Sequence, residues 1–350
     1  MSKATGLFLT SPGSLELREF DLREPASGEV VVRVAGCGLC HTDVSFFTGA
    51  VRTRHSLPLI LGHEIAGTVE AAPAPFEALQ GRRVLVPAVI PCDTCALCRA
   101  GRDTACSHQT MPGNDIDGGF ATHTVVPARH LVGLPDDLGG HSLTDLAVIA
   151  DAVTTPLQAL RRACVQADDL VVIIGVGGIG TYAVQIAIAL GANVAAIDVD
   201  PDKLARARSL GSRWTFDPGA TDARGIRKCL AAESGASTDR WRILEMSGTA
   251  RGQELGWSLL PPAGTIGVIG FTMDKPDIRL SNLMALDATA FGSWGCSPRH
   301  YQQAVDLVLS GQIQVTPFIE PQPLTGGAHF FEAPHGARRV VLVPPSAEAM

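Results

Sequence analysis

Four cysteines lie close together in the stretch PCDTCALCRAGRDTAC, where Cys92, Cys95, Cys98 and Cys106 have the spacing C-x2-C-x2-C-x7-C. Four thiolates on one short segment can complete a tetrahedral zinc site that leaves no position open for a substrate. An iron–sulfur cluster or unbound thiols are the alternatives, but nothing else in the sequence indicates electron transfer. We therefore expect a structural zinc ion on a small lobe at residues 91–107, which would loosen without its metal.

A second set of potential metal ligands lies earlier in the chain. Cys40 follows the segment GCGL, and His63 lies further along in the segment LGHE. Thiolate sulfur and imidazole nitrogen are both good zinc ligands. Two such residues do not make a site, however, and a single buried cysteine or histidine is usually structural. A third ligand is needed before this pair predicts a catalytic metal.

Residues 170–198, LVVIIGVGGIGTYAVQIAIALGANVAAID, have the pattern of a dinucleotide-binding unit. A β-branched run leads into a glycine turn, a helical stretch follows up to Gly191, and a second apolar run ends at Asp198. The expected cofactor contacts of the turn are Gly175, Gly177, Gly178, Ile179 and Gly180.

Each part of this pattern has a physical role in binding a dinucleotide. Gly175 permits the tight turn, Gly177 lets the backbone approach a pyrophosphate, and Gly180 lets the helix pack closely on the strand. Free N–H groups at the helix start would bind the phosphates. Asp198 would accept hydrogen bonds from ribose hydroxyls and repel a 2′-phosphate, which favours NAD over NADP. The alternative is a glycine-rich loop in an ordinary α/β domain.

The surrounding elements divide the chain into two domains. Residues 1 to about 35 alternate as antiparallel strands do, whereas residues 151–295 alternate between apolar runs and helical patterns, which predicts a doubly wound parallel sheet. Strands are expected at 241–248, 264–271 and 291–296, and helices at 249–259 and 298–309. The terminal stretch RRVVLVP is expected to return as a strand to the first domain. The fold class is therefore α/β, with a Rossmann domain at 151–295 and a β-rich domain formed by 1–150 and 296–350.

The composition limits the function classes. The chain has 350 residues, 46% of them hydrophobic and 18% charged, with a net charge of −7, so no basic surplus indicates binding to nucleic acid or to a membrane. The sequence shows no signal peptide and no apolar run long enough for a membrane span, so we expect a cytoplasmic protein. The remaining cysteines, Cys37, Cys164, Cys229 and Cys296, are expected to be buried.

The motifs GLCHTD, GHE, the four-cysteine lobe, GVGGIG and the distal acid occur in the order found in zinc-dependent medium-chain alcohol dehydrogenases. The chain resembles that family over nearly its whole length. The resemblance implies a GroES-like catalytic domain around an inserted Rossmann domain. It also implies two zinc ions per chain, one catalytic and one structural, with NAD as cofactor and assembly into a homo-oligomer, a dimer or a tetramer.

The same resemblance implies roles for particular residues. Cys40, His63 and Asp151 correspond to the catalytic zinc ligands, and Glu64 corresponds to an alternate ligand. Thr42 corresponds to the hydroxyl that contacts the substrate oxygen, and Asp43 to a residue that orients a ligand. The implied cofactor contacts are His41, Lys203 and Arg339, together with Thr155, Ile269 and Phe271 around the nicotinamide. Two departures are an aspartate as third ligand and Ser45 in place of a relay histidine, which leaves the proton exit route open.

The stretches at 111–129, 151–160, 270–285 and 292–296 further resemble the 6-hydroxycyclohex-1-ene-1-carbonyl-CoA dehydrogenases of anaerobic aromatic degradation. This implies a cyclic enoyl-CoA substrate, oxidised from ring alcohol to ketone, and it raises the hypothesis that the chain also reduces a C=C bond. Arg52, Arg54 and His55 are candidate phosphate contacts, although exposed loop charges are more often only solvated. The alternatives are a dehydrogenase of a small alcohol or polyol and a non-catalytic NAD-binding relative.

Overall fold

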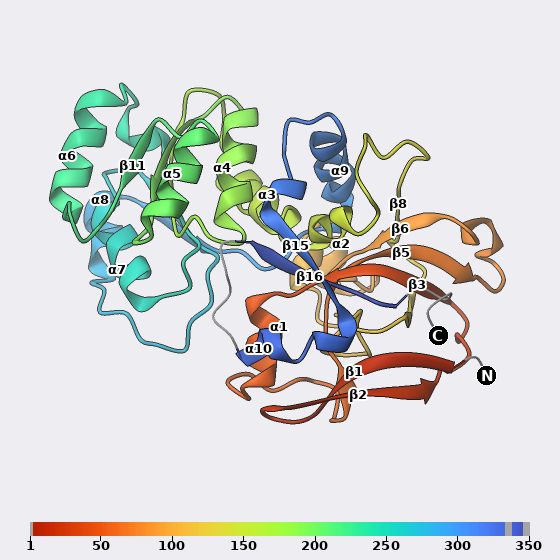
Figure 1. The fold of residues 1–350 in the computed structure, drawn as a ribbon. Helices are drawn as coiled ribbons and strands as arrows, with labels where there is room; N and C mark the ends of the chain where they lie inside the picture. The colour runs from red at the N-terminus through yellow and green to blue at the C-terminus, as the bar shows by residue number, and fades with distance from the viewer. Residues whose placement is uncertain (1–2, 333–337, 346–350) are drawn as a thin grey trace. The chain divides into compact units, whose positions relative to one another are not determined.

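The computed structural model describes residues 3–332 and 338–345, and the chain divides into two compact units. The first unit comprises residues 1–154 and 295–350, and the second comprises residues 155–294. Within the described part of the chain, no helix is both long enough and apolar enough to cross a membrane. The two units are described separately below (Figure 1).

The first unit is built on two sheets. A seven-stranded sheet has the order β15-β16-β3-β5-β6-β8, with β7 also paired to β3, and a three-stranded sheet has the order β2-β1-β4. Their strands are β1 (Lys3–Ser11), β2 (Ser14–Asp21), β3 (Glu29–Gly38), β4 (Leu59–Ile60), β5 (Glu64–Ala71), β6 (Arg83–Val86), β7 (His123–Pro127), β8 (Val132–Gly133), β15 (Ile319–Pro323) and β16 (Arg339–Val343). A large buried apolar cluster includes residues from both sheets.

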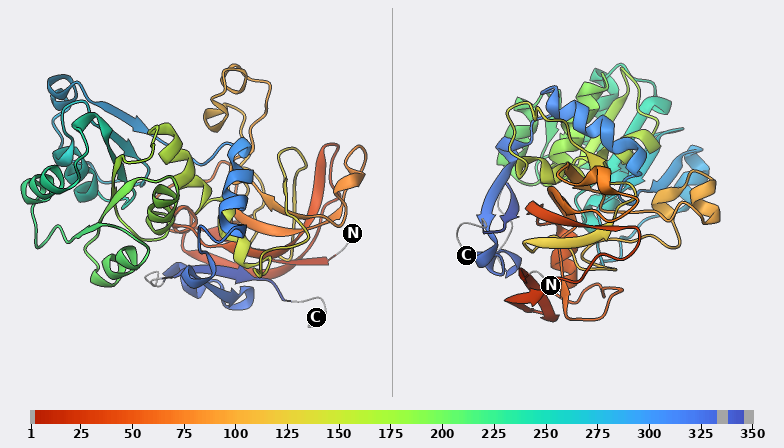
Figure 2. Two further views of the ribbon diagram at one scale, coloured as in Figure 1. Left: turned by 90° about the horizontal axis from the view of Figure 1, so that it is seen from above. Right: turned by 90° about the vertical axis from the view of Figure 1, so that its right-hand side faces the viewer.

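The C-terminal strands belong to this first unit, as the sequence predicts. β16 pairs antiparallel with β3, with Val341 opposite Gly38, and both views of Figure 2 show the C-terminal segment in blue beside the N-terminal strands in red. The helices of the unit are short: α1 (His41–Phe47), α2 (Ala96–Arg99), α9 (Tyr301–Leu309) and α10 (His329–Glu332), with 3-10 turns at η1 (Glu77–Leu79), η2 (Asp103–Ala105), η3 (Asp145–Ala150), η5 (Pro298–His300), η6 (Thr316–Phe318) and η7 (Leu324–Gly326).

The second unit is a six-stranded sheet of order β11-β10-β9-β12-β13-β14 in which all neighbours are parallel. In chain order this is 3-2-1-4-5-6, the order of a Rossmann fold, so the predicted doubly wound sheet is confirmed. Its strands are β9 (Leu170–Ile174), β10 (Asn193–Ile197), β11 (Trp214–Phe216), β12 (Trp241–Glu245), β13 (Thr265–Val268) and β14 (Thr289–Gly292). Its helices are α3 (Thr154–Arg162), α4 (Gly180–Ala189), α5 (Pro201–Ser209), α6 (Ala223–Glu233), α7 (Ala250–Leu259) and α8 (Ser281–Leu286), with a 3-10 turn, η4 (Thr238–Arg240).

Some predicted boundaries differ from those observed. The strand expected at 291–296 is β14, which ends at Gly292, and the helix expected at 298–309 begins as the 3-10 turn η5 before it continues as α9. Cys37 and Cys296 are buried as predicted, but Cys229 is only half-buried and Cys164 is exposed. The prediction for Cys164 is wrong because this residue follows the end of α3 in a turn, with a φ of 53°.

Candidate functional site

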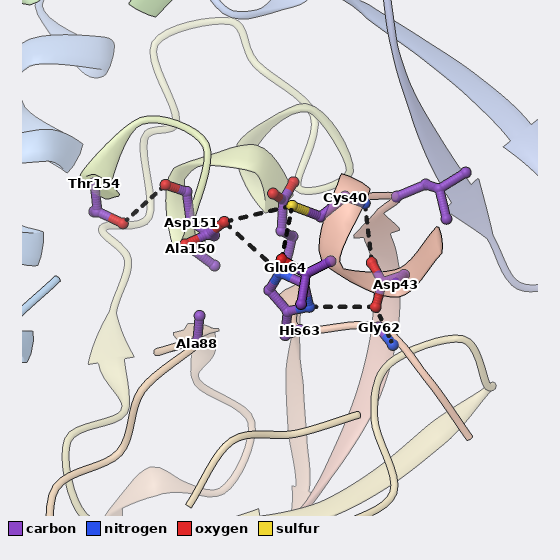
Figure 3. A network of polar contacts seen from close by, with 12 residues as sticks. Cys40, Asp43, Gly62, His63, Glu64, Ala88, Ala150, Asp151 and Thr154 are labelled. Atoms are coloured by element: carbon purple, nitrogen blue, oxygen red, sulfur yellow. Dashed lines mark hydrogen bonds and ion pairs between the residues drawn. The ribbon is translucent and has the colours of Figure 1, made fainter. Parts of the chain in front are cut away.

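Four potential metal ligands from distant parts of the chain meet in the first unit. The ligand atoms of Cys40, His63, Glu64 and Asp151 all lie within 4.8 Å of one another, and we call this group the Cys40 site (Figure 3). Cys40 immediately precedes α1, His63 and Glu64 lie where β5 begins, and Asp151 follows the 3-10 turn η3. The structure therefore brings together the three ligands expected for a catalytic zinc, with Glu64 beside them.

The side chains of this group face one another in a largely buried place. The Oδ2 of Asp151 lies 3.8 Å from the Sγ of Cys40 and 3.6 Å from the Nε2 of His63. Cys40 is 9% exposed, whereas His63 and Glu64 are almost completely buried. The hydroxyl of Thr42 lies 3.8 Å from the same Sγ of Cys40. His41 is exposed at the start of α1.

Asp43 fixes both segments that carry the first two ligands. Its carboxylate accepts hydrogen bonds from the backbone N–H of Cys40 at 2.9 Å and of Gly62 at 3.1 Å. Its Oδ1 also lies 3.3 Å from the Nδ1 of His63, on the side of the ring away from Asp151. A carboxylate on the second ring nitrogen orients a histidine and leaves the first nitrogen free to bind a metal. Asp43 thus lies where it can orient His63, the role that the family resemblance implies for it.

Burial and neighbouring charges shift the pKa values of this group. Burial alone would lower the pKa of His63, but the negative charge of Asp43 and the contact with Asp151 outweigh it and raise the pKa well above its usual value. Burial raises the pKa of Glu64 to about 8, against the opposing effect of the Arg339 guanidinium. The Nη1 of Arg339 lies 2.7 Å from the Oε1 of Glu64 and donates to the carbonyl of Leu39 at 3.2 Å. The role of Arg339 as a pyrophosphate contact remains a prediction, because its observed partners are Glu64 and Leu39.

The four-cysteine lobe has its sulfur atoms together as the spacing predicts. The ligand atoms of Cys92, Cys95, Cys98 and Cys106 lie within 4.8 Å of one another, with the Sγ of Cys95 at 3.5 Å from that of Cys98 and 3.8 Å from that of Cys106. Hydrogen bonds lower two of the thiol pKa values, to about 6 for Cys92, chiefly from Thr94, and to about 5 for Cys95, chiefly from the backbone N–H of Cys98. Burial raises the pKa of Cys98 to about 12. Four sulfurs at these distances suit a closed tetrahedral metal shell.

The glycine turn of the second unit has the predicted geometry. Gly175 has a φ of +85°, a conformation that favours glycine. A Cβ at Gly180 would lie 1.9 Å from the carbonyl oxygen of Gly175, so only glycine permits this approach of α4 to the turn. A Cβ at Gly177 would meet nothing closer than the Nζ of Lys203 at 4.0 Å, which leaves open space above the turn. Gly178 is exposed and Ile179 is half-buried.

Asp198 lies at the end of β10 and holds the glycine turn. Its Oδ2 accepts a hydrogen bond from the backbone N–H of Val176 at 2.9 Å, and its Oδ1 accepts one from Asp200 at 3.0 Å. The Nζ of Lys203 lies 3.9 Å from the same Oδ1. Each carboxylate oxygen has a second lone pair, so the group can still accept from ribose hydroxyls.

Asp198→Ala is expected to weaken NAD binding by about tenfold or more and to reverse the preference toward NADP, because a bidentate acceptor for the ribose disappears together with a charge that repels a 2′-phosphate. Lys203 would then lose its ion pair with Asp198 and would lie beside the expected ribose position. The check is the KM for each cofactor, with Asp202→Ala, in the first turn of α5, as the control. An unchanged ratio of the two KM values would contradict the role of Asp198.

The remaining predicted cofactor residues are distributed over two segments. Thr155 is buried at the start of α3. Ile269 and Phe271 follow the carboxyl end of β13, and the N–H of Ile269 donates to the carbonyl of Glu245 at 2.9 Å. Phe271 is 51% exposed. The carboxyl ends of parallel strands are where ligands bind in such sheets.

Glu245 is a residue that the sequence analysis did not single out. It ends β12 with no exposed surface, and its Oε1 accepts hydrogen bonds from the backbone and hydroxyl of Ser247. Within the described residues its Oε2 has no hydrogen-bond partner. Burial raises the pKa of Glu245 above its usual value of 4.5, against these hydrogen bonds. The signal available in the sequence is an acid at the end of a buried apolar run, WRILE.

Glu245→Gln is expected to stabilise the protein increasingly as the pH rises. The folded protein holds the Glu245 proton more tightly than the unfolded chain does. The contribution of Glu245 to the free energy of unfolding is therefore fully present below about pH 4.5 and is lost as the pH rises through the raised pKa of this group. Glutamine has no charge to bury. Urea unfolding of both proteins between about pH 4 and 8 measures the effect. If the free energies of unfolding of the two proteins differ by the same amount at every pH, Glu245 does not titrate as a buried group.

Comparisons with known proteins bear on both units. Residues 26–136 match the family description "Alcohol dehydrogenase GroES-like domain", and residues 178–310 match "Zinc-binding dehydrogenase". The chain is 31% identical over 311 residues to an alcohol dehydrogenase of Moraxella sp. (strain TAE123), covering 88% of this chain and 89% of that protein.

Two solved structures extend the likeness to the fold. Galactitol-1-phosphate dehydrogenase from Escherichia coli superimposes with a TM-score of 0.89 at 27% identity, covering 97% of this chain and 100% of that one. Acetophenone reductase from Geotrichum candidum NBRC 4597, solved in complex with NAD, has a TM-score of 0.84 at 26% identity and covers 97% of each chain. The expected combination of a GroES-like part with a Rossmann sheet is thereby confirmed.

Proposed function

Because the chain belongs to the zinc-binding alcohol dehydrogenase family, we propose that it oxidises a secondary alcohol by transferring hydride to NAD. The observation that carries this proposal is the Cys40 site, where a thiol, an imidazole and two carboxyl groups converge beside the hydroxyl of Thr42. The Rossmann unit with its open glycine turn and Asp198 supports the choice of cofactor.

The donor set of the Cys40 site fits a catalytic zinc. Cys40, His63 and Asp151 would provide three ligands, the number typical of catalytic zinc sites with one open position. The carboxyl groups of the half-buried Asp151 and the buried Glu64 lie close together, and a divalent cation would compensate their charge. When bound, zinc supplies Lewis acidity that polarises the substrate oxygen. The four-cysteine lobe would hold the second, structural zinc ion.

The protein's own residues have separate tasks in this reaction. Asp43 orients His63, and Thr42 would relay the alcohol proton, its Oγ1 accepting that proton while its own hydroxyl proton passes on toward solvent. The carbinol carbon would transfer hydride to NAD. Ser45 does not continue this proton route, because its hydroxyl already donates its hydrogen to the carbonyl of His41 at 3.0 Å. His41, Lys203 and Arg339 are proposed to bind the phosphates and ribose of the cofactor, and Thr155, Ile269 and Phe271 to place the nicotinamide.

For the substrate, the proposal is 6-hydroxycyclohex-1-ene-1-carbonyl-CoA, oxidised to the 6-oxo compound. The support is the likeness of the stretches 111–129, 151–160, 270–285 and 292–296 to dehydrogenases of that substrate. Reduction of the conjugated C=C by NADH is a further hypothesis. A polyol is the second candidate, since one solved relative acts on galactitol 1-phosphate.

The test is NADH formation by the purified, zinc-loaded enzyme with the hydroxy-enoyl-CoA, the corresponding free acid, galactitol 1-phosphate and simple secondary alcohols. We expect turnover with the CoA ester to exceed that with the free acid. If the enzyme prefers a polyol or a simple alcohol, the proposed substrate is wrong but the proposed reaction still holds. Tight binding of NAD with no turnover on any alcohol would indicate a non-catalytic relative, and absence of a ring-saturated product with NADH would exclude C=C reduction.

A further inference from the structure

A buried tyrosine connects three segments around the third proposed zinc ligand. Tyr301 is the first residue of α9 and has no exposed surface. Its hydroxyl donates a hydrogen bond to the carbonyl of Ala150 and accepts one from the backbone N–H of Ala88 at 3.1 Å. Ala150 is the last residue of η3 and directly precedes Asp151. We propose that Tyr301 is a positioning residue that fixes the Asp151 carboxylate for metal binding, an inference that rests on the proposed zinc site.

Asp151 needs such support because it lies outside any regular element. It occupies the break between η3 and α3, with φ and ψ of −144° and −53°. A carbonyl at the end of a short helical turn has no partner in that turn, and Tyr301 supplies one for Ala150. The second restraint is Thr154, whose hydroxyl donates to the carbonyl of Asp151 at 3.4 Å. Both restraints hold the backbone and leave the Asp151 carboxylate directed at Cys40 and His63 (Figure 3).

The hydroxyl of Tyr301 joins segments that lie far apart in the sequence. Tyr301 reaches Ala88 after β6 and Ala150 at the end of η3, so one oxygen atom joins the sheet of the first unit to the ligand segment. The ring itself packs with Ala150 and Cys296 in a small buried cluster. A purely structural role would depend on this ring packing, whereas the positioning role depends on the hydroxyl. Tyr301→Phe separates the two because it keeps the ring.

The test compares Tyr301→Phe with Tyr182→Phe and the wild type, each loaded with Co²⁺ in place of zinc. Tyr182 is equally buried but lies in α4 of the second unit, so it controls for loss of a buried hydroxyl. We expect Tyr301→Phe to weaken metal binding at the Cys40 site by about 10-fold to 100-fold, the range for residues that support a ligand. The visible absorption of Co²⁺ at that site should change, while metal in the four-cysteine lobe is retained and Tyr182→Phe resembles wild type.

Unchanged affinity and an unchanged Co²⁺ spectrum in Tyr301→Phe would overturn the inference. If that variant does not fold, Thr154→Val removes the second restraint on the same backbone, the hydrogen bond to the carbonyl of Asp151, and it should weaken the site by a smaller factor but in the same direction. If Thr154→Val then leaves metal binding at the Cys40 site unchanged, the inference that restraints on this backbone position Asp151 is overturned. Failure of the wild type itself to bind a second metal would instead refute the proposed zinc site, and with it the basis for positioning by Tyr301.

Discussion

Asp151→Ala is expected to remove one of the two zinc ions and to lower kcat/KM for alcohol oxidation by about 1000-fold or more. The substitution deletes one of three converging ligands, leaving Cys40 and His63 alone with Glu64. Loss of the metal removes the Lewis acid that stabilises charge on the substrate oxygen, an effect of several kcal/mol, and about 4 kcal/mol corresponds to 1000-fold in rate. The measurement is zinc content and steady-state kinetics on the same preparation.

Asp145→Ala is the matched control for this experiment. Asp145 lies at the other end of η3 and accepts a hydrogen bond from the N–H of Ser142 at 3.0 Å, away from the Cys40 site. It should retain both zinc ions and most of the activity. If Asp151→Ala keeps full zinc content, Asp151 is not a ligand. If zinc stays and activity is lost, Asp151 acts on the substrate and not on the metal.

Local patterns in the sequence predict those parts of the molecule whose residues are close in the chain. The strand, glycine turn and helix at 170–189 follow from residue types alone, since Gly175 and Gly180 occupy positions where a Cβ could not fit. The four-cysteine lobe is equally local, because its spacing already limits how far apart the sulfurs can be. The parallel order of the second sheet follows from the alternation of strands and helices.

Contacts between distant segments could not be predicted in this way. Nothing near Tyr301 in the sequence indicates that its hydroxyl would join Ala88 and Ala150. The pairing of Arg339 with Glu64 likewise depends on β16 returning to β3, which places a C-terminal cation beside an N-terminal acid. Only the resemblance to a family implies that Asp151 is a ligand, since an aspartate shortly before TTP is locally indistinguishable from a helix cap.

The lobe and the Cys40 site are connected through the segment that leads into α9. Asp103, in η2 of the lobe, is buried and accepts a hydrogen bond from the hydroxyl of Ser297 at 2.6 Å. The Nε of Arg299 lies 3.4 Å from the same carboxylate. Two residues after Arg299 comes Tyr301, which holds the carbonyl of Ala150. Order in the lobe therefore supports the segment that supports Asp151.

Cys95→Ser is accordingly expected to produce the opposite pattern from Asp151→Ala, with a large loss of local stability and a smaller loss of activity. Only two of the four lobe cysteines, Cys98 and Cys106, are buried, so the lobe has little apolar core to replace a metal that contributes on the order of 10 kcal/mol in small zinc-binding peptides. Zinc content should fall by one, and residues 91–107 should become sensitive to proteases and exchange their amide hydrogens rapidly.

The control for that variant is Cys164→Ser, which changes an exposed cysteine outside the lobe and should leave zinc content and protease resistance unaltered. The position of the remaining metal decides the interpretation. Co²⁺ retained at the Cys40 site, with reduced activity, would indicate that the disorder spreads through Asp103 and Ser297 toward Tyr301. Full activity would show that the lobe is independent of the Cys40 site, and full zinc content would show that its cysteines do not bind the second metal.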